Sequence, residues 1–265
     1  MKIESALGSL HQLDDLAAGG TVIHRLHPLS KLLVTVVFLG AVASCGRYST
    51  IGLLPFLLYP VVLIGLGGLP IAGILRRVFL ILPFAFFMGV FNPVFDRAPM
   101  AVFGMTVAGG WVSFASILIR FLLSMAAGVI LVSTTGFAAV CSALSLLRLP
   151  RVFVEQLMFM YRYLFVLAEE ITRLGIAFTL RAGGRQRPGI RVYASLTGQL
   201  LLRTLDRAQR IHQAMTCRGY DGRIITSPPR RMRADDLVYL LGWTGFFILA
   251  RLYNLPELLG LLFTG

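Results

Sequence analysis

Five long apolar stretches dominate this chain and limit what it can fold into. They occupy residues 32–45, 51–69, 78–95, 111–136 and 237–253. A helix that crosses the hydrocarbon core of a bilayer needs about 20 apolar residues, and these stretches come close to that length. Only 14% of all residues are charged, against roughly 25% in soluble domains, so the chain has too few charges to cover a water-facing surface. The sequence predicts an all-α integral membrane protein with about five transmembrane helices.

The distribution of basic residues predicts the orientation in the membrane. If the N-terminus is cytoplasmic, all but four of the 25 Lys and Arg residues belong to the cytoplasmic side, the four being Arg47, Arg97, Arg120 and Arg251. Cytoplasmic loops carry such an excess. We therefore expect a multi-pass membrane protein with a cytoplasmic N-terminus and the C-terminus on the outer side. Because basic loops account for the net charge of +13, the expected surroundings are membrane lipid, and no nucleic-acid partner is expected.

The charged residues also divide the chain. Residues 137–235 contain 16 arginines among many large apolar side chains, which suits neither a loop nor a membrane span. We expect a membrane domain of four spans over residues 1–136, a cytoplasmic helical region over 137–235 and a returning span over 236–265. A short or re-entrant segment is also possible around residues 100–110, between the third and fourth spans.

Two long amphipathic helices are expected within residues 137–235. The first covers 152–181, where Glu169 and Arg173 are spaced to form an ion pair one helical turn apart. Its charges Glu155, Arg162, Glu169 and Arg173 share one face. The second covers 190–218, with Arg203, Arg207 and Arg210 on one face and Leu201, Leu205, Ala208 and Met215 on another. A Gly-rich, Pro-containing segment separates the two helices. At 1.5 Å per residue each helix is about 40 Å long, and we expect them to pack on each other along the inner membrane surface.

The two helices end alike. Each has an alanine one turn before a terminal arginine, Arg181 or Arg218, and small residues around it, which are Ala182 and Gly183 in the first helix and Cys217 and Gly219 in the second. An arginine and a glycine at a helix C-terminus also serve as ordinary capping residues, because the cation complements the helix dipole. Recurrence at a spacing of 37 residues favours a paired function.

These features resemble the transmembrane T component of energy-coupling factor (ECF) transporters, in its cobalt and nickel, CbiQ-like subgroup. The resemblance rests on the segment His24-Arg25-Leu26-His27-Pro28-Leu29-Ser30-Lys31-Leu32, the four-span block, the paired helices and the returning span, and it covers nearly the whole chain. Met215-Thr216-Cys217-Arg218-Gly219-Tyr220 is its most specific part. The first arginine motif reads Leu180-Arg181-Ala182 instead of the usual Ala-Arg-Gly or Ala-Arg-Ser, which leaves Arg185 as an alternative to Arg181.

The resemblance implies a protein of a bacterial or archaeal-type inner membrane. It implies a non-catalytic subunit that links two cytoplasmic ATP-binding subunits to a substrate-binding, metal-capturing membrane subunit. The two helices would be coupling helices, and their terminal arginines would dock on the ATPases, for which the planar and permanently charged guanidinium is well suited. The expected cargo is Co²⁺ or Ni²⁺, with a vitamin importer as the alternative. An integral-membrane enzyme acting on a lipid substrate is less favoured, because the cytoplasmic acids are scattered. A secondary transporter would show internal repeats, and none is evident.

No catalytic residues and no cofactor are expected, because the sequence lacks GK[ST], HExxH and GxSxG motifs. No metal site is expected either: His24 and His27 are three residues apart, but Pro28 interrupts the helical face and no carboxylate has matching spacing. Pro28 and Lys31 are expected to set a bend and an interfacial anchor before the first span, or else simply to start its helix, with the lysine side chain reaching the membrane interface. Arg120 lies inside the fourth span, where a charge is costly. It either lines a partner interface or pairs within the bundle.

Overall fold

A computed structural model describes residues 8, 14–46, 51–95, 99–102, 105–147, 149–181, 183, 189–221 and 232–252. The chain divides into two compact units. The first, here called the apolar unit, comprises Leu13–Ala143 and Arg230–Gly265. The second, here called the helix-pair unit, comprises Leu144–Pro229 together with Met1–Gln12.

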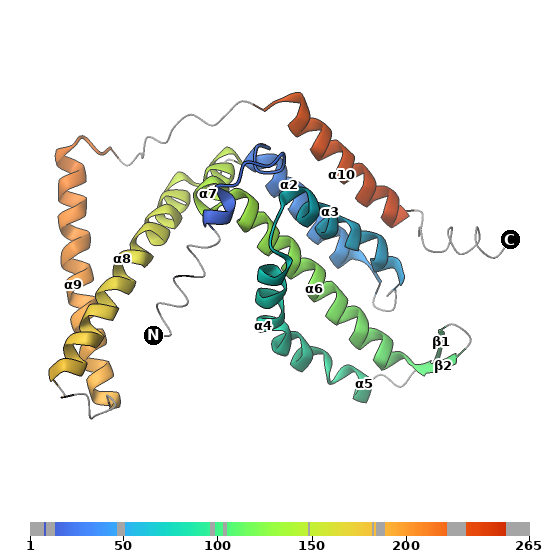
Figure 1. The fold of residues 1–265 in the computed structure, drawn as a ribbon, viewed down its shortest axis with the longest axis horizontal. Helices are drawn as coiled ribbons and strands as arrows, with labels where there is room; N and C mark the ends of the chain where they lie inside the picture. The colour runs from blue at the N-terminus through green and yellow to red at the C-terminus, as the bar shows by residue number, and fades with distance from the viewer. Residues whose placement is uncertain are drawn as a thin grey trace. The chain divides into compact units, whose positions relative to one another are not determined.

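The apolar unit is a bundle of helices around one aromatic core. Helix α2 (Pro28–Ser44) packs against α6 (Gly109–Thr135) and α10 (Ala234–Leu252), and α4 (Ile71–Gly89) packs against α6 (Figure 1). A 3₁₀ segment, η1 (Ile51–Leu57), leads into α3 (Leu58–Gly67). The rings of Phe38, Phe56, Tyr59 and Phe247 meet in the core, with centroids 4.7 to 6.1 Å apart. Aromatic contacts therefore join α2, α3 and α10, which lie far apart in the sequence.

The helix boundaries correct several of the expected spans. The third apolar helix begins at Ile71, right after Pro70, so Arg76 and Arg77 belong to the helix instead of preceding it. It ends at Gly89 instead of Phe95, and the separate short helix α5 (Asn92–Phe95) contains Pro93. The second expected span is a 3₁₀ segment containing Pro55 followed by α3. Proline removes a backbone donor and clashes with the preceding turn, which explains such interruptions.

The segment around residues 100–110 is not re-entrant helix. It forms a small antiparallel hairpin of β1 (Pro99–Val102) and β2 (Met105–Ala108), from which α6 continues directly. Apart from turns and irregular connections, this hairpin is the one non-helical element among the described residues.

Two of the described helices are long and apolar enough to cross a membrane by themselves, Ile71–Gly89 and Gly109–Thr135. Shorter apolar helices cover Pro28–Ser44, Gly52–Gly67 and Phe137–Leu146. Helix α10 has 19 residues and carries Asp235, Asp236 and Arg251 at its ends. The count of five spans stays a prediction.

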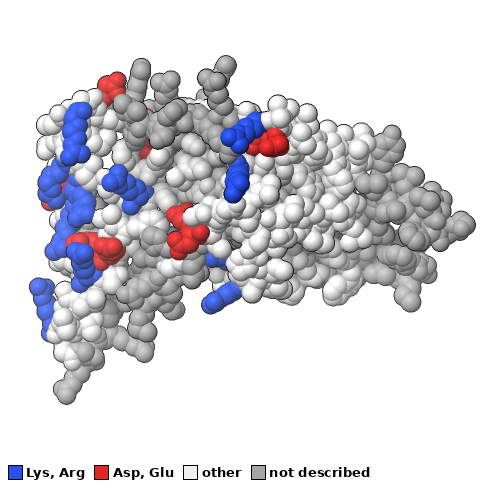
Figure 2. Space-filling model, turned by 45° about the horizontal axis from the view of Figure 1, so that its top comes forward, with Lys and Arg blue, Asp and Glu red and all other residues white. Residues whose placement is uncertain are grey.

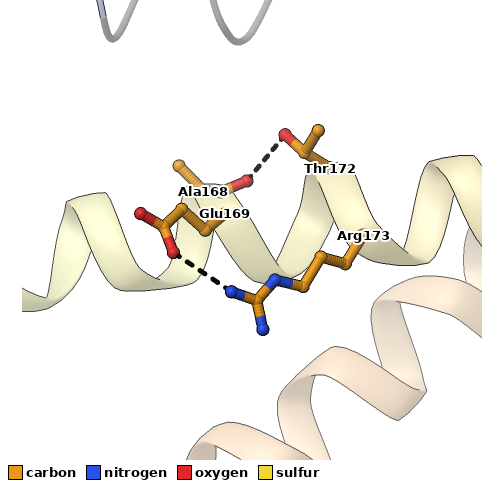
Figure 3. Close-up of polar contacts among 4 residues, drawn as sticks. All are labelled: Ala168, Glu169, Thr172 and Arg173. Atoms are coloured by element: carbon orange, nitrogen blue, oxygen red, sulfur yellow. Dashed lines mark hydrogen bonds and ion pairs between the residues drawn. The ribbon is translucent and has the colours of Figure 1, made fainter.

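The helix-pair unit contains the two long helices at the predicted places. They are α8 (Arg151–Arg181) and α9 (Ile190–Cys217), and the short α7 (Phe137–Leu146) precedes them (Figure 1). The predicted ion pair between Glu169 and Arg173 is confirmed, with 3.5 Å between Nη2 and Oε2 (Figure 3). The expected packing is only partly correct: α8 and α9 are in contact, but α9 buries none of its residues in the chain. Its Leu201, Leu202 and Leu205 are 58%, 65% and 52% exposed.

Candidate coupling site

Helices α8 and α9 run antiparallel. Arg203 Nη1 of α9 lies 2.6 Å from Glu170 Oε1 in the middle of α8. Arg191, at the start of α9, lines one groove of about 600 Å³ together with Arg181, at the end of α8. At the other end, Tyr220 Oη donates a hydrogen bond to Glu155 Oε2 near the start of α8, at 3.2 Å. Residue numbers along α9 therefore increase in the direction in which those along α8 decrease.

The antiparallel arrangement places the two predicted arginines at opposite ends of the pair. Arg181 belongs to the last turn of α8, and Arg218 follows α9 near the beginning of α8. The 26 residues from Glu155 to Arg181 correspond to about 40 Å of helix at 1.5 Å per residue. Both arginines are exposed. The structure therefore offers two separate cationic helix ends and not one combined patch.

The end of α9 is a Schellman motif. Gly219 has φ +81°, and its N–H donates to the Thr216 carbonyl at 3.0 Å, while the Tyr220 N–H donates to the Met215 carbonyl at 3.0 Å. These two bonds satisfy carbonyls that a helix end leaves without partners. Glycine adopts this left-handed conformation without the steric cost that a Cβ brings. The Met-x-x-Arg-Gly-Tyr motif thus has a local structural role besides any partner contact.

We expect Gly219→Ala to loosen the end of α9, since a left-handed residue with a Cβ costs about 1–2 kcal/mol. Amide hydrogen exchange at residues 219 and 220 should accelerate roughly five- to tenfold, measured by mass spectrometry on the purified chain in detergent. The control is Gly198→Ala in the middle of α9, where an added Cβ meets nothing within 4 Å. It should slow exchange in α9 or leave it unchanged. Equal exchange at residues 219 and 220 in the wild type and Gly219→Ala would contradict the assigned role.

The end of α8 turns at Gly183, which has φ +61° and whose N–H donates to the Leu180 carbonyl at 3.3 Å. Ala182 and the alternative arginine Arg185 lie outside the described residues. Cys217, the other predicted neighbour, is an exposed free thiol in the last turn of α9.

The helix-pair unit carries a strongly mixed charge pattern with an excess of arginine. Figure 2 shows Lys and Arg side chains gathered over this unit with a few acidic side chains among them. The groove beside Arg181 is lined by Arg173, Arg191 and Arg203 against the single acid Glu170. Ion pairs between solvent-exposed side chains contribute about 0–1 kcal/mol each. The side chains of this surface can therefore rearrange at little energetic cost.

The apolar unit holds a second polar cluster, here called the polar junction, made of His27, Lys31, Thr134 and Asp236. Lys31 is 3% exposed, and its Nζ donates to the Thr134 carbonyl at 2.8 Å. Asp236 is 2% exposed; one carboxylate oxygen accepts from the His27 N–H at 2.7 Å and the other from the Arg233 N–H at 2.8 Å. Lys31 and Asp236 also interact electrostatically.

The polar junction changes the interpretation of Pro28 and Lys31. Pro28 starts α2 as expected, and the His27 side chain caps the helix by accepting from the Leu29 N–H at 3.1 Å. Lys31, expected as an interfacial anchor, instead points into the unit and binds the C-terminal turn of α6, where a cation complements the helix dipole. The junction joins the start of α2, the end of α6 and the start of α10. The chain leaves for the helix-pair unit after α6 and returns from it before α10.

Arg120 and Arg251 are the two charges inside apolar stretches. Each of them contacts the chain at the other end of α2, away from the polar junction. Arg120 Nη2 of α6 donates to the Gly46 carbonyl. Arg251 Nη2 of α10 donates to the Ser44 carbonyl at 3.0 Å. Arg251 therefore binds the carbonyl of the last residue of α2, which a helix end leaves without an intrahelical partner, and Arg120 binds the carbonyl two residues beyond it. For Arg120 this geometry favours pairing within the bundle over a partner interface.

No metal centre is formed by the described residues, which contain no cluster of three or more His, Cys, Asp or Glu side chains. The imidazoles singled out in the sequence have other contacts. His24 Nδ1 lies 2.7 Å from Thr21 Oγ1, and burial lowers the pKa of His24 below its ordinary value. His27 caps α2. His11 lies outside the described residues.

Sequence reasoning missed several residues that the structure brings into these sites. Asp236 and Thr134 complete the polar junction, Arg251 shares the end of α2 with Arg120, and Tyr220 and Glu155 fix the end of α9. One signal was available for Asp236: an acid three residues after a helix N-cap typically reaches back to the N-cap N–H. The long-range partners had no local signal.

Residues 19–228 match a family model described as the cobalt transport protein CbiQ. The chain is 31% identical over 154 residues to the cobalt transport protein CbiQ of Salmonella typhimurium, covering 53% of this chain and 68% of that relative. It is 33% identical over 102 residues to the protein of the same name from Rhodobacter capsulatus, covering 37% and 42%. It is also 31% identical over 109 residues to a putative fused cobalt transport protein CbiMQ of Methanocorpusculum labreanum, covering 41% and 18%.

Proposed function

Because the chain belongs to the CbiQ family of cobalt transport proteins, we propose that it is the membrane-embedded coupling subunit of an ATP-driven importer of the ECF type. It links two cytoplasmic ATP-binding subunits to a substrate-binding membrane subunit and catalyses no reaction itself. The observation that carries this proposal is the position of Arg181 and Arg218 at opposite ends of one antiparallel helix pair. Two cationic ends about 40 Å apart suit two docking sites, one for each ATP-binding subunit.

The exposed surface of α9 also supports the proposal. Three leucines on this helix are more than half exposed, and the helix buries no residue within the chain. Apolar side chains that lie beside arginines in this way are typical of protein interfaces, where a partner covers them. We propose that the partner subunits cover this face in the assembled transporter.

The directions of the helices agree with the proposed membrane topology. Helix α2 starts beside the start of α10 and the end of α6, as the polar junction shows, so α2 and α10 run parallel and α6 runs against them. A topology of five spans with a cytoplasmic N-terminus requires these directions. The helix-pair unit, connected between α6 and α10, then belongs to the cytoplasmic side, where its arginines agree with the positive-inside rule.

Cobalt is the proposed cargo, with nickel as the nearest alternative and a vitamin as the more distant one. The relatives from Salmonella typhimurium and Rhodobacter capsulatus are named as cobalt transport proteins. The described residues of this chain form no ligand cluster that could select a metal, so we assign selectivity to the substrate-binding subunit. The relative named as a CbiMQ fusion supports a membrane partner that works beside this chain.

The proposal is tested by co-purification. The tagged chain is expressed with the products of its neighbouring genes, extracted in detergent and isolated through the tag. We expect ATP-binding subunits and a second membrane subunit to be recovered with it, and the isolated complex to hydrolyse ATP. The purified chain alone should not hydrolyse ATP. Recovery of the chain without any ATP-binding subunit would contradict the proposal.

A further inference from the structure

The contact between Tyr220 and Glu155 lies at the end of α9, where the three residues after Arg218 belong to the described part of the chain. Tyr220 comes two residues after Arg218 and directly after Gly219, and its hydroxyl donates to the Glu155 carboxylate at 3.2 Å. Glu155 belongs to the second turn of α8, so the bond joins the end of α9 to the beginning of α8. Both residues are half-buried.

The backbone of this segment is already constrained by the Schellman motif. Its two hydrogen bonds fix the direction in which the chain leaves α9, and this direction carries the Tyr220 ring toward α8. The side-chain bond then ties the helix end to a second element. A hydrogen bond from a neutral hydroxyl to a carboxylate is stronger than one between neutral groups, because the acceptor is charged.

We propose that Tyr220 and Glu155 form a latch that positions Arg218 for docking on an ATP-binding subunit. The inference rests on the proposed function. Neither residue needs to contact the partner: the latch acts by holding the end of α9 against α8, so that the arginine is presented from a fixed position. A binding group that is already ordered loses less conformational entropy on docking, which increases affinity. A helix end that is held in place also passes a movement of the bound subunit on to the rest of the helix pair, whereas a mobile end would move by itself.

The native thiols permit a direct test of the positioning role. Cys217 is exposed and adjacent to Arg218, whereas Cys45 and Cys141 are buried, so a nitroxide label attached to the purified chain reports on the end of α9. We expect Tyr220→Phe and Glu155→Ala each to increase the mobile fraction of the spectrum, and the double variant to add little to either change. Glu155→Gln retains an acceptor oxygen and should keep much of the wild-type spectrum. The control Tyr193→Phe removes an exposed hydroxyl from the other end of α9 and should change nothing.

Docking is then measured with unlabelled chains, by titrating ATP-binding subunits onto the chain held in detergent with its membrane partner. Tyr220→Phe and Glu155→Ala should weaken binding about three- to tenfold, the range of one hydrogen bond, and Glu155→Gln should restore much of it. Unchanged label mobility, or increased mobility with wild-type binding, would overturn the latch. If the wild-type chain binds no ATP-binding subunit at all, the proposed function fails and the positioning role fails with it. In that case a mobility change still reports the contact itself.

Discussion

The Asp236→Ala variant should lose about 3 kcal/mol of unfolding free energy. The substitution leaves the buried His27 N–H and the part-buried Arg233 N–H without their carboxylate acceptor. It also leaves the buried Lys31 ammonium without the nearby negative charge. Losing one partner of a buried charged pair typically costs 3–5 kcal/mol, because the remaining charge stays desolvated. A drop of this size should lower the midpoint of thermal unfolding by on the order of 5–10 °C, measured on the purified chain in detergent.

The neighbouring carboxylate provides a matched control for the polar junction. Asp235 occupies the same turn of α10 but is exposed, so Asp235→Ala should cost no more than about 0.5 kcal/mol. Adding Lys31→Met to Asp236→Ala should be less harmful than the sum of the two single changes, since neither charge then remains buried alone. Equal midpoints for Asp236→Ala and Asp235→Ala would show that the junction does not hold the three helices together.

The double charge reversal Arg181→Glu plus Arg218→Glu should remove the ATP-binding subunits from the purified complex. A docked guanidinium pairs best with a carboxylate, so we expect acidic groups on the ATP-binding subunits to receive Arg181 and Arg218. Each new carboxylate would face these groups, and like-charge contacts at an interface cost several kcal/mol. We expect recovery of ATP-binding subunits to fall at least about tenfold. The substrate-binding membrane subunit should still be recovered, because the apolar unit is unchanged.

The control for this variant is Arg162→Glu plus Arg210→Glu. These arginines are exposed on the same two helices but lie away from their C-terminal turns, so the control changes the net charge by the same amount. It should retain the ATP-binding subunits. If both double variants lose these subunits equally, general charge and not the two helix ends determines the association.

The sequence predicted local features of the helix-pair unit closely. Charge and apolar spacing, together with the Gly- and Pro-containing segment between the helices, indicated helices over 152–181 and 190–218, and the structure has them at Arg151–Arg181 and Ile190–Cys217. Such patterns depend on residues three and four positions apart, which the sequence displays directly. The same spacing argument predicted the ion pair between Glu169 and Arg173.

These spacing patterns do not predict contacts between elements that are far apart in the sequence. The partners in the polar junction are separated by 103 and 209 positions, and nothing in the local sequence of Lys31 distinguishes a buried lysine from one that reaches the membrane interface. Arg120 and Arg251 looked like isolated charges in apolar stretches, although both serve the end of α2. The start of α4 was misplaced because Arg76 and Arg77 were interpreted as a flank, while the helix begins about two turns earlier than residue 78, directly after Pro70. Pairing of this kind depends on the tertiary arrangement, which periodicity does not encode.

The proposed coupling of ATP hydrolysis by the partner subunits to metal movement is tested most directly by the uptake of radioactive cobalt into vesicles. The vesicles contain the ATP-binding subunits and the substrate-binding membrane subunit, with and without this chain. We expect ATP-dependent cobalt accumulation only when the chain is present, and none when the chain is the sole protein in the vesicle. Equal ATP-dependent accumulation in vesicles that lack the chain would contradict the proposed coupling.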